Sequence, residues 1–295
     1  MSRDWESTFG SWAKAPSTTE LTKCQHAETA IREAVKKDET LGQHDIIVFP
    51  QGSYRNRTNV RADSDVDICI LCHGTFFYGL PDGMAAHQFD IEPSSYPYAT
   101  FKNDVDHALR EHFGILAVTR GNKAFDIHQN TYRVDADAVA CFDYHLYRAD
   151  GSWEQGTSFL PDNGGQVINY PEQNYSNGVS KNTATNRRFK KAVRIFKRLR
   201  NEMADNGNIF AQPVPSFLIE SLVWNAPNMH FTYSTWSQIL REILAFLFHA
   251  TDDPGDCAEW CEINGIKYLF HPTQRWTQQI AHNFILAAWN HVGFE

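Results

Sequence analysis

Apolar residues in the first half of the chain recur with two different periods. Residues 17–38 repeat them at helical spacing after a Ser/Thr cap and Glu20, so this segment predicts a helix. Residues 101–113 predict a second amphipathic helix, and 52–58 reads as a turn that feeds a short helix or loop. Four segments predict strands, because apolar residues run or alternate there: 45–50, 64–71, 117–129 and 132–147. The remaining segments read as a loose arm, a long loop and a hairpin or loop: 1–17, 73–100 and 148–165.

After about residue 170 the period is helical throughout. Residues 180–208 predict one long helix ending at Asn206-Gly207, and its apolar stripe is Phe189, Val193, Phe196, Leu199 and Met203. Three further helices are expected at 215–227, 234–250 and 273–292. The chain is therefore expected to be α+β. A core with an N-terminal helix would span 1–170, a helical domain would span 171–295, and a cleft would lie between them.

Composition narrows the classes of function. The net charge of −8 disfavours a protein that coats nucleic acid, which would be basic, so no stable nucleic-acid partner is expected. A small phosphorylated substrate stays possible, since a metal and a local basic patch can neutralise phosphates. No apolar run is long enough to span a bilayer, and the first residues have no hydrophobic signal region. The six cysteines are interpreted as mostly buried, reduced thiols, so we expect a cytoplasmic protein with no membrane partner.

The polar stretch before residue 71 carries the chemistry. Asp65 and Asp67 stand two residues apart in a predicted strand, so both side chains should lie on one face. Two adjacent carboxylates repel each other, and a divalent cation resolves that conflict. A solvated strand face with two exposed aspartates is the structural alternative. Gly52-Ser53, 12 residues before the acid pair, forms a turn whose N–H groups and hydroxyl can approach a phosphate.

A third acid is expected on another strand. Asp135 and Asp137 again stand two apart, and either could complete a metal site or remain a surface acid.

The extended motif GSYRNRTNVRADSDVDICIL resembles the G-S…D-x-D signature of polymerase-β-like nucleotidyltransferases. More narrowly, it is similar to bacterial relatives of cyclic GMP–AMP synthase and oligoadenylate synthase. These are the cyclic-oligonucleotide synthases (CD-NTases) of anti-phage CBASS systems. The segments at 169–201 and 215–228 also resemble the helical half of this family, so the resemblance covers nearly the whole chain. It implies a polymerase-β-like core with a mixed sheet.

The resemblance also implies roles for individual residues. Gly52 and Ser53 would hold the donor triphosphate, while Asp65, Asp67 and Asp137 would be the catalytic metal ligands. Asp137 is preferred over Asp135 because the family's third acid often precedes a V-V-P or V-L-P stretch. Ala140 stands here where the proline is common. The implied cofactor is Mg²⁺ in a two-metal site, for which Mn²⁺ can substitute.

Basic and amide side chains of the second half are the other candidate substrate contacts. Helical spacing places six basic residues opposite the apolar stripe, and Lys191 or Lys197 is expected to touch a nucleotide unless the face is only solvated. Upstream, Tyr170 and Tyr175 could stack on a base, and the amides that could read its edge are Asn169, Asn174 and Asn182.

These features predict a Mg²⁺-dependent enzyme that joins nucleoside triphosphates into a cyclic dinucleotide or small cyclic oligonucleotide, and a uridine-containing product is favoured. The ring closure and the anti-phage role are implied by the resemblance, as is a separate effector that senses the product. Two alternatives remain: a nucleotidyltransferase that modifies RNA or protein, and an inactive scaffold or antitoxin of the same fold.

Overall fold

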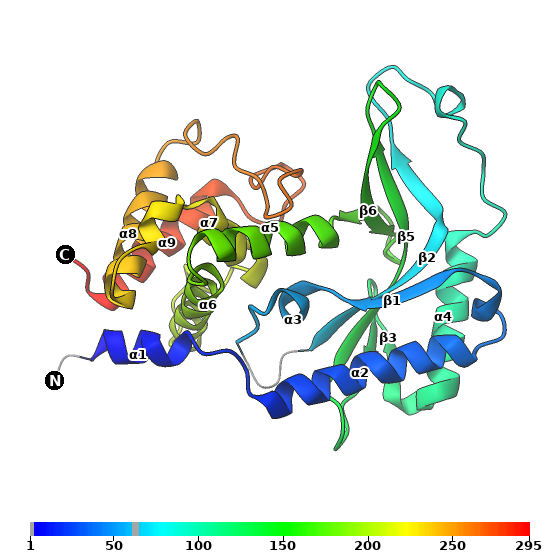
Figure 1. Cartoon of the computed structure of the whole chain (residues 1–295), viewed down its shortest axis with the longest axis horizontal. Coiled ribbons are helices and arrows are strands. Elements are labelled where there is room, and N and C mark those ends of the chain that lie inside the picture. Colours follow the sequence, from blue (N-terminus) through cyan, green and yellow to red (C-terminus); the bar gives the residue numbers. More distant parts are fainter. Residues whose placement is uncertain (1–2, 61–64) are drawn as a thin grey trace. The chain divides into compact units, whose positions relative to one another are not determined.

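The computed structural model describes residues 3–60 and 65–295, which form two compact units (Figure 1). The core unit comprises 17–55 and 65–171, and the helical unit comprises 3–16, 56–60 and 172–295. The predicted division after residue 170 thus falls close to the last crossing of the chain between units. The N-terminal residues and the short segment 56–60, however, group with the C-terminal helices.

The core unit is built on a mixed sheet whose described strands run in the order β1-β2-β5-β4-β3, with β6 on β5 and β7 on β6. β2 and β5 are parallel, and the other pairs are antiparallel. The strands are β1 (Ile46–Pro50), β2 (Val66–Gly79), β3 (Val118–Arg120), β4 (Phe125–Ile127), β5 (Ala136–Tyr147), β6 (Trp153–Phe159) and β7 (Val167–Asn169). The predicted mixed sheet is confirmed.

Two helices supply the core of this unit together with the central strands. α2 (Thr18–Lys37) begins with the predicted Ser17 cap, and Glu20 closes a capping box. α4 (Tyr98–Phe113) buries Phe101, Val105 and Leu109 completely. Figure 1 shows both helices running along the sheet. The short elements are α3 (Gly52–Asn56), η1 (Leu41–Gln43), η2 (Ala86–Phe89) and η3 (Ile115–Ala117).

Three predictions for the core unit were wrong in detail. The strand expected at 117–129 is the pair β3 and β4, joined by a turn in which Gly121 N–H bonds to the Ala124 carbonyl. The loop expected from residue 73 begins as strand, because β2 continues to Gly79 alongside β5. The region expected to be a hairpin or loop holds β6, which extends the sheet beside β5. In each case the hydrogen-bonded pairing with a neighbouring strand determines where the strand begins and ends.

The helical unit packs six helices and one short turn of helix around an apolar core: α1 (Trp5–Trp12), α5 (Pro171–Ala184), α6 (Phe189–Asp205), α7 (Ser216–Asn225), η4 (Asn228–Phe231), α8 (Trp236–Ala250) and α9 (Gln278–Val292). The predicted stripe of α6 is confirmed, since all five residues are at most 1% exposed. The prediction of a loose N-terminal arm was wrong. This segment forms α1, capped by Asp4, because Trp5, Phe9 and Trp12 make one apolar face.

The single helix predicted at 180–208 is two helices. The chain turns between α5 and α6 at Asn186 and Arg187, whose φ angles are +50° and +61°. Helices do not continue through two such left-handed residues. α5 also starts earlier than expected, at the proline that opens it.

All six cysteines are free thiols, and five are buried, as the sequence analysis expected. Among the described helices, none is long and apolar enough to cross a membrane.

Candidate active site

Three aspartates stand in one row across three neighbouring strands of the core unit. Asp67 on β2 pairs in register with Asp137 on β5, and Asp137 pairs in register with Asp126 on β4. Residues in register share a face of the sheet. Asp65 lies just before β2, two positions from Asp67, and its charge also acts on Asp137. We call these four side chains the acid row.

Gly52 brings the Gly-Ser turn against the acid row. A Cβ atom on Gly52 would stand 2.1 Å from Oδ2 of Asp67, and the φ angle of Gly52 is +61°. The residue before Gly52 is also held in place, because Gln51 N–H donates a hydrogen bond to the Asp67 carbonyl at 2.8 Å. Only glycine fits this position. Gly52-Ser53 and the D-x-D pair, separate in the sequence, are thus brought together.

Two members of the acid row, Asp137 and Asp65, hold protons more tightly than isolated carboxylates do. Burial, followed by the charges of Asp67, Asp65 and Asp126, raises the pKa of Asp137 to about 7. Burial also raises the pKa of Asp65, with the charges of Asp135 and Asp126 adding to it. Protonated Asp137 donates a hydrogen bond to Asp126. Without a cation, therefore, the row reduces its own repulsion by keeping a proton.

The structure separates the two candidates for a third acid. Asp137 is in register with Asp67, whereas a side-chain oxygen of Asp135 accepts a 2.6 Å hydrogen bond from Gln129 N–H. The preferred candidate therefore faces the D-x-D pair. Asp126 was missed by the sequence analysis. It is a single acid on a three-residue strand, and only its pairing with β5 reveals the role.

These carboxylates fit a divalent cation. Oxygen ligands are what Mg²⁺ prefers, and the repulsion that raises the pKa of Asp137 is what a cation would relieve. The Gly52 backbone leaves Asp67 room that any side chain would take. Asp65, Asp67 and Asp137 are the residues that could hold the metal.

The basic face predicted on α6 is buried at two of its positions. Arg194 and Lys197 are 5% and 1% exposed. Arg194 donates to the carbonyls of Ala13 and Arg57, and burial lowers its pKa to about 10. Lys197 forms a buried ion pair with Glu220 and donates to the Thr58 carbonyl at 3.2 Å. The charge of Lys197 is therefore neutralised by Glu220 within the protein, without a nucleotide phosphate.

The other candidate contacts are placed in different environments. Lys191 is exposed on α6. Asn174 lies on α5, and its buried side-chain oxygen has no hydrogen-bond partner within the described residues. Asn169 ends β7 beside Thr157.

Two residues expected near the base are used within the protein. Tyr170 is 3% exposed and packs edge-on against Tyr144, so stacking of its ring on a base was a wrong expectation. The Asn182 side chain accepts from Lys190 N–H at the start of α6.

One open cavity of about 550 Å³ lies in the helical unit, and none of the candidate site residues lines it. It is lined by His230, Glu242, Ala245, Phe246, His249, Ala250 and Asp256. The acid row, with its crowded charges and matched register, is the stronger candidate for chemistry.

The chain is similar to known nucleotidyltransferases. Residues 176–293 match the model of the cGAS/DncV-like nucleotidyltransferase C-terminal helical domain. The chain is 46% identical to the cyclic dipyrimidine nucleotide synthase CdnE of Legionella pneumophila, over 99% of each chain. It is 39% identical to the protein of the same name from Cecembia lonarensis, over the full length of both.

Two solved structures have the same fold. CdnE cyclic dinucleotide synthase of Elizabethkingia meningoseptica, solved with GTP and Apcpp, superposes with a TM-score of 0.82 at 33% identity, covering 98% of this chain and 99% of its own. The c-UMP-AMP synthase CdnE of Rhodothermus marinus, solved with Apcpp and Upnpp, gives 0.87 at 28% identity, covering 98% of each chain. With its acid row on a mixed sheet and full-length relatives of this kind, the chain belongs to the CD-NTases, the cGAS/DncV-like family of nucleotidyltransferases.

Proposed function

We propose that this protein joins two nucleoside triphosphates into a cyclic dinucleotide and releases pyrophosphate. The observation that carries the proposal is the acid row, in which Asp67 and Asp137 are in register and Gly52-Ser53 lies against Asp67. The relatives from Legionella and Cecembia, which match over nearly their whole length, support it because both are named cyclic dinucleotide-forming enzymes.

The reaction proceeds in two like steps. A ribose hydroxyl of one nucleotide attacks the α-phosphorus of the other. The new P–O bond replaces the bond to the β-phosphate, pyrophosphate leaves, and the hydroxyl proton is released to solvent. The linear product keeps one triphosphate, which the second ribose hydroxyl attacks in the same way. A second pyrophosphate leaves and the ring closes.

Asp65, Asp67 and Asp137 are the proposed catalytic residues. These carboxylates would hold two Mg²⁺ ions, or Mn²⁺ in their place, which would supply a lower pKa for the attacking hydroxyl and charge compensation for the departing pyrophosphate. The protein itself contributes carboxylate oxygens that are held at fixed positions in the acid row. The strand register positions Asp67 against Asp137, and Asp126 orients Asp137 through their hydrogen bond.

Other residues would bind the substrates. Ser53 would donate its N–H and hydroxyl to the donor triphosphate, with the adjacent Gly52 leaving its backbone open to approach. Exposed Lys191 would add a positive charge for phosphate. Asn169 and Asn174 would each be a candidate to read a base edge, and the side-chain oxygen of Asn174 has no hydrogen-bond partner among the described residues.

The product is proposed to contain a pyrimidine, in line with the names of the relatives from Legionella and Cecembia and with the c-UMP-AMP synthase of Rhodothermus. As a CBASS enzyme, the protein would make this compound as a messenger for a separate effector in anti-phage defence.

The test is product identification. The purified protein is incubated with all four ribonucleoside triphosphates and Mg²⁺ or Mn²⁺, treated with phosphatase, and analysed by mass spectrometry. Asp65→Asn/Asp67→Asn is the inactive comparison, and Asp150→Asn, in the exposed turn after β5, is the matched control. We expect a phosphatase-resistant cyclic product that only the double variant lacks.

Two outcomes would count against the proposal. A linear product alone would contradict ring closure. Transfer of a labelled nucleotide to added RNA or protein, with no cyclic product, would support the alternative transferase.

A further inference from the structure

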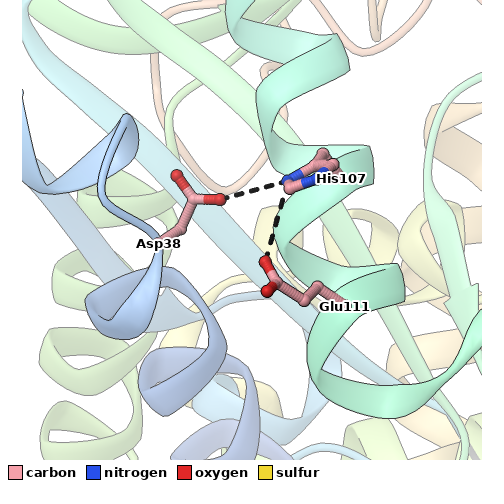
Figure 2. Close-up of side chains that lie close together, drawn as sticks. All are labelled: Asp38, His107 and Glu111. Carbon is pink, nitrogen blue, oxygen red and sulfur yellow. Dashed lines mark hydrogen bonds and ion pairs between the residues drawn. The ribbon is translucent and has the colours of Figure 1, made fainter.

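A second cluster of metal-ligating atoms lies on α4 of the core unit, outside the acid row. Asp38 caps the end of α2, while His107 and Glu111 stand one turn apart on α4. Figure 2 shows the two carboxylates directed at the same imidazole nitrogen, Nδ1 of His107. One ligand atom from each residue lies within 4.8 Å of the other two.

The hydrogen bond between Asp38 and His107 is long. Oδ2 of Asp38 is 3.4 Å from Nδ1 of His107, beyond the usual 2.7–3.2 Å of an N–H···O bond. In the same unit, His73 and Asp143 approach to 2.7 Å. Two ligands of a tetrahedral zinc ion, each about 2.0–2.1 Å from the metal, stand about 3.3–3.5 Å apart. The Asp38–His107 distance falls in that range.

Asp38 is held in place as a ligand would be. Its side chain is 6% exposed, and its other oxygen, Oδ1, accepts a 2.9 Å hydrogen bond from Leu41 N–H. Such an outer contact orients a metal-binding carboxylate. Glu111 Oε2 is 3.9 Å from the imidazole, and its side chain is 71% exposed, so it can move the remaining fraction of an ångström.

From this geometry we infer that Asp38, His107 and Glu111 form a zinc site, with water in the fourth position. Mixed nitrogen and carboxylate ligands favour Zn²⁺ over Mg²⁺, which prefers oxygen alone. The exposure of His107 and Glu111 leaves the fourth position open to solvent. A bound ion would fasten the end of α2 to α4 and so stabilise the core unit.

The test is zinc binding by the full-length protein after dialysis against a chelator. Zn²⁺ is titrated calorimetrically with excess Mg²⁺ present to fill the acid row, and thermal unfolding is followed with and without Zn²⁺. His107→Gln removes the nitrogen ligand. His112→Gln is the matched control, since it makes the same change on the same helix, where the His112 ring packs on Phe113. Glu111→Gln tests the exposed carboxylate without disturbing the Asp38 cap.

We expect wild type and His112→Gln to bind about one zinc ion per chain and to gain thermal stability. His107→Gln should bind about tenfold or more weakly and lose the thermal shift, and Glu111→Gln should bind more weakly than wild type. Equal binding by the two histidine variants would overturn the inference. So would a wild-type protein that binds no zinc in the presence of Mg²⁺.

Discussion

Asp137 gives the acid row a dependence on pH that can be measured. Its pKa in the folded, metal-free protein is about 7, against an ordinary value of 3.8. The folded state therefore binds this proton more tightly than the unfolded state does. The resulting stabilisation is complete below about pH 4 and is lost as the pH rises through about 7. Asp65, whose pKa is also raised, acts in the same direction.

In EDTA, then, we expect the free energy of unfolding to fall by about 1–2 kcal/mol between pH 5 and pH 8 from this cause, after allowance for solvent screening. Mg²⁺ binds the deprotonated carboxylates, so it should add more stability at pH 8 than at pH 5. Thermal unfolding at both pH values, with EDTA or Mg²⁺, measures this. Asp137→Asn should remove most of the effect and leave the part due to Asp65. A stabilisation by Mg²⁺ that is equal at both pH values would contradict it.

Asp126 should tune Asp137 without being essential. Asp126→Asn removes a negative charge and replaces one acceptor oxygen with an NH2 donor, so the pKa of Asp137 should fall. We expect product formation at pH 6 to approach the rate at pH 8, with Asp150→Asn unchanged as the control. A loss of about a hundredfold or more at every pH would instead make Asp126 a required ligand.

Gly52 should tolerate no side chain. In Gly52→Ala the new Cβ would meet Oδ2 of Asp67, at a φ angle of +61°. We expect a stability loss of about 1–2 kcal/mol from the backbone alone and a near-complete loss of product, because Asp67 must move. Urea unfolding and product assays measure the two effects. Gly83→Ala, at a φ of +78° with open space around it, is the control for the backbone cost.

For single residues, the sequence could predict those site residues whose positions depend only on their spacing along the chain. Asp65, Asp67 and the Gly-Ser turn share one continuous motif, and Asp137 repeats the i, i+2 arrangement. Asp126 could not be found this way, because its place depends on the register between β4 and β5. Tyr170 was misread since its burial against Tyr144 arises from the pairing of β6 with β5 and of β7 with β6.

Among the elements, α6 departs most from its predicted surface. The helical period of the sequence correctly predicts the apolar stripe of α6. It does not predict which groups bind the charged side chains of this helix. Those partners are Glu220 on α7 and the carbonyls of Arg57 and Thr58, all distant in sequence. Segment 56–60 joins the Gly-Ser turn to the D-x-D pair in the chain. Arg194 and Lys197 therefore hold the backbone carbonyls of Arg57 and Thr58, which lie between the two parts of the motif in the chain.

Lys197→Met should destabilise the helical unit strongly. It leaves Glu220 buried without its cation and the Thr58 carbonyl without this donor. We expect a loss of about 3–5 kcal/mol in urea unfolding. Lys191→Met, the same change at an exposed position of α6, is the control and should cost little. Lys197→Met/Glu220→Leu should recover part of the loss. Equal stability of the two single variants would show that the ion pair is not a structural anchor.

For the whole molecule, the order of the chain does not follow the order of the units. The predicted boundary near residue 170 rested on the change from mixed to helical period, which is a real feature of the sequence. Composition could not show that residues 3–16 pack with helices that begin more than 150 residues later. The signal was present in Trp5, Phe9 and Trp12, but eight residues are too few for a helical period to be distinguished from an arm.

This arrangement makes the N-terminal segment part of the helical unit's core. Phe9 is fully buried, Glu6 accepts the N–H groups of Trp236 and Ser237 at the start of α8, and the Ala13 carbonyl accepts from Arg194. Deleting residues 1–16 would expose the apolar surface under Phe9, at a cost of about 2–3 kcal/mol, and would leave Arg194 donors unpaired. The helical unit should therefore be destabilised by several kcal/mol.

Tryptophan fluorescence can assign that loss to one unit. Seven of the eight tryptophans lie in the helical unit, and only Trp153 lies in the core unit. In the deletion variant the main fluorescence transition should move to lower temperature. Phe9→Ala should reproduce part of this shift, while Ser11→Ala, on the exposed side of the same helix, should leave it unchanged. If the deletion variant kept the wild-type transition, the first helix would not belong to the core of the helical unit, and that unit would begin near residue 171, as the sequence alone suggests.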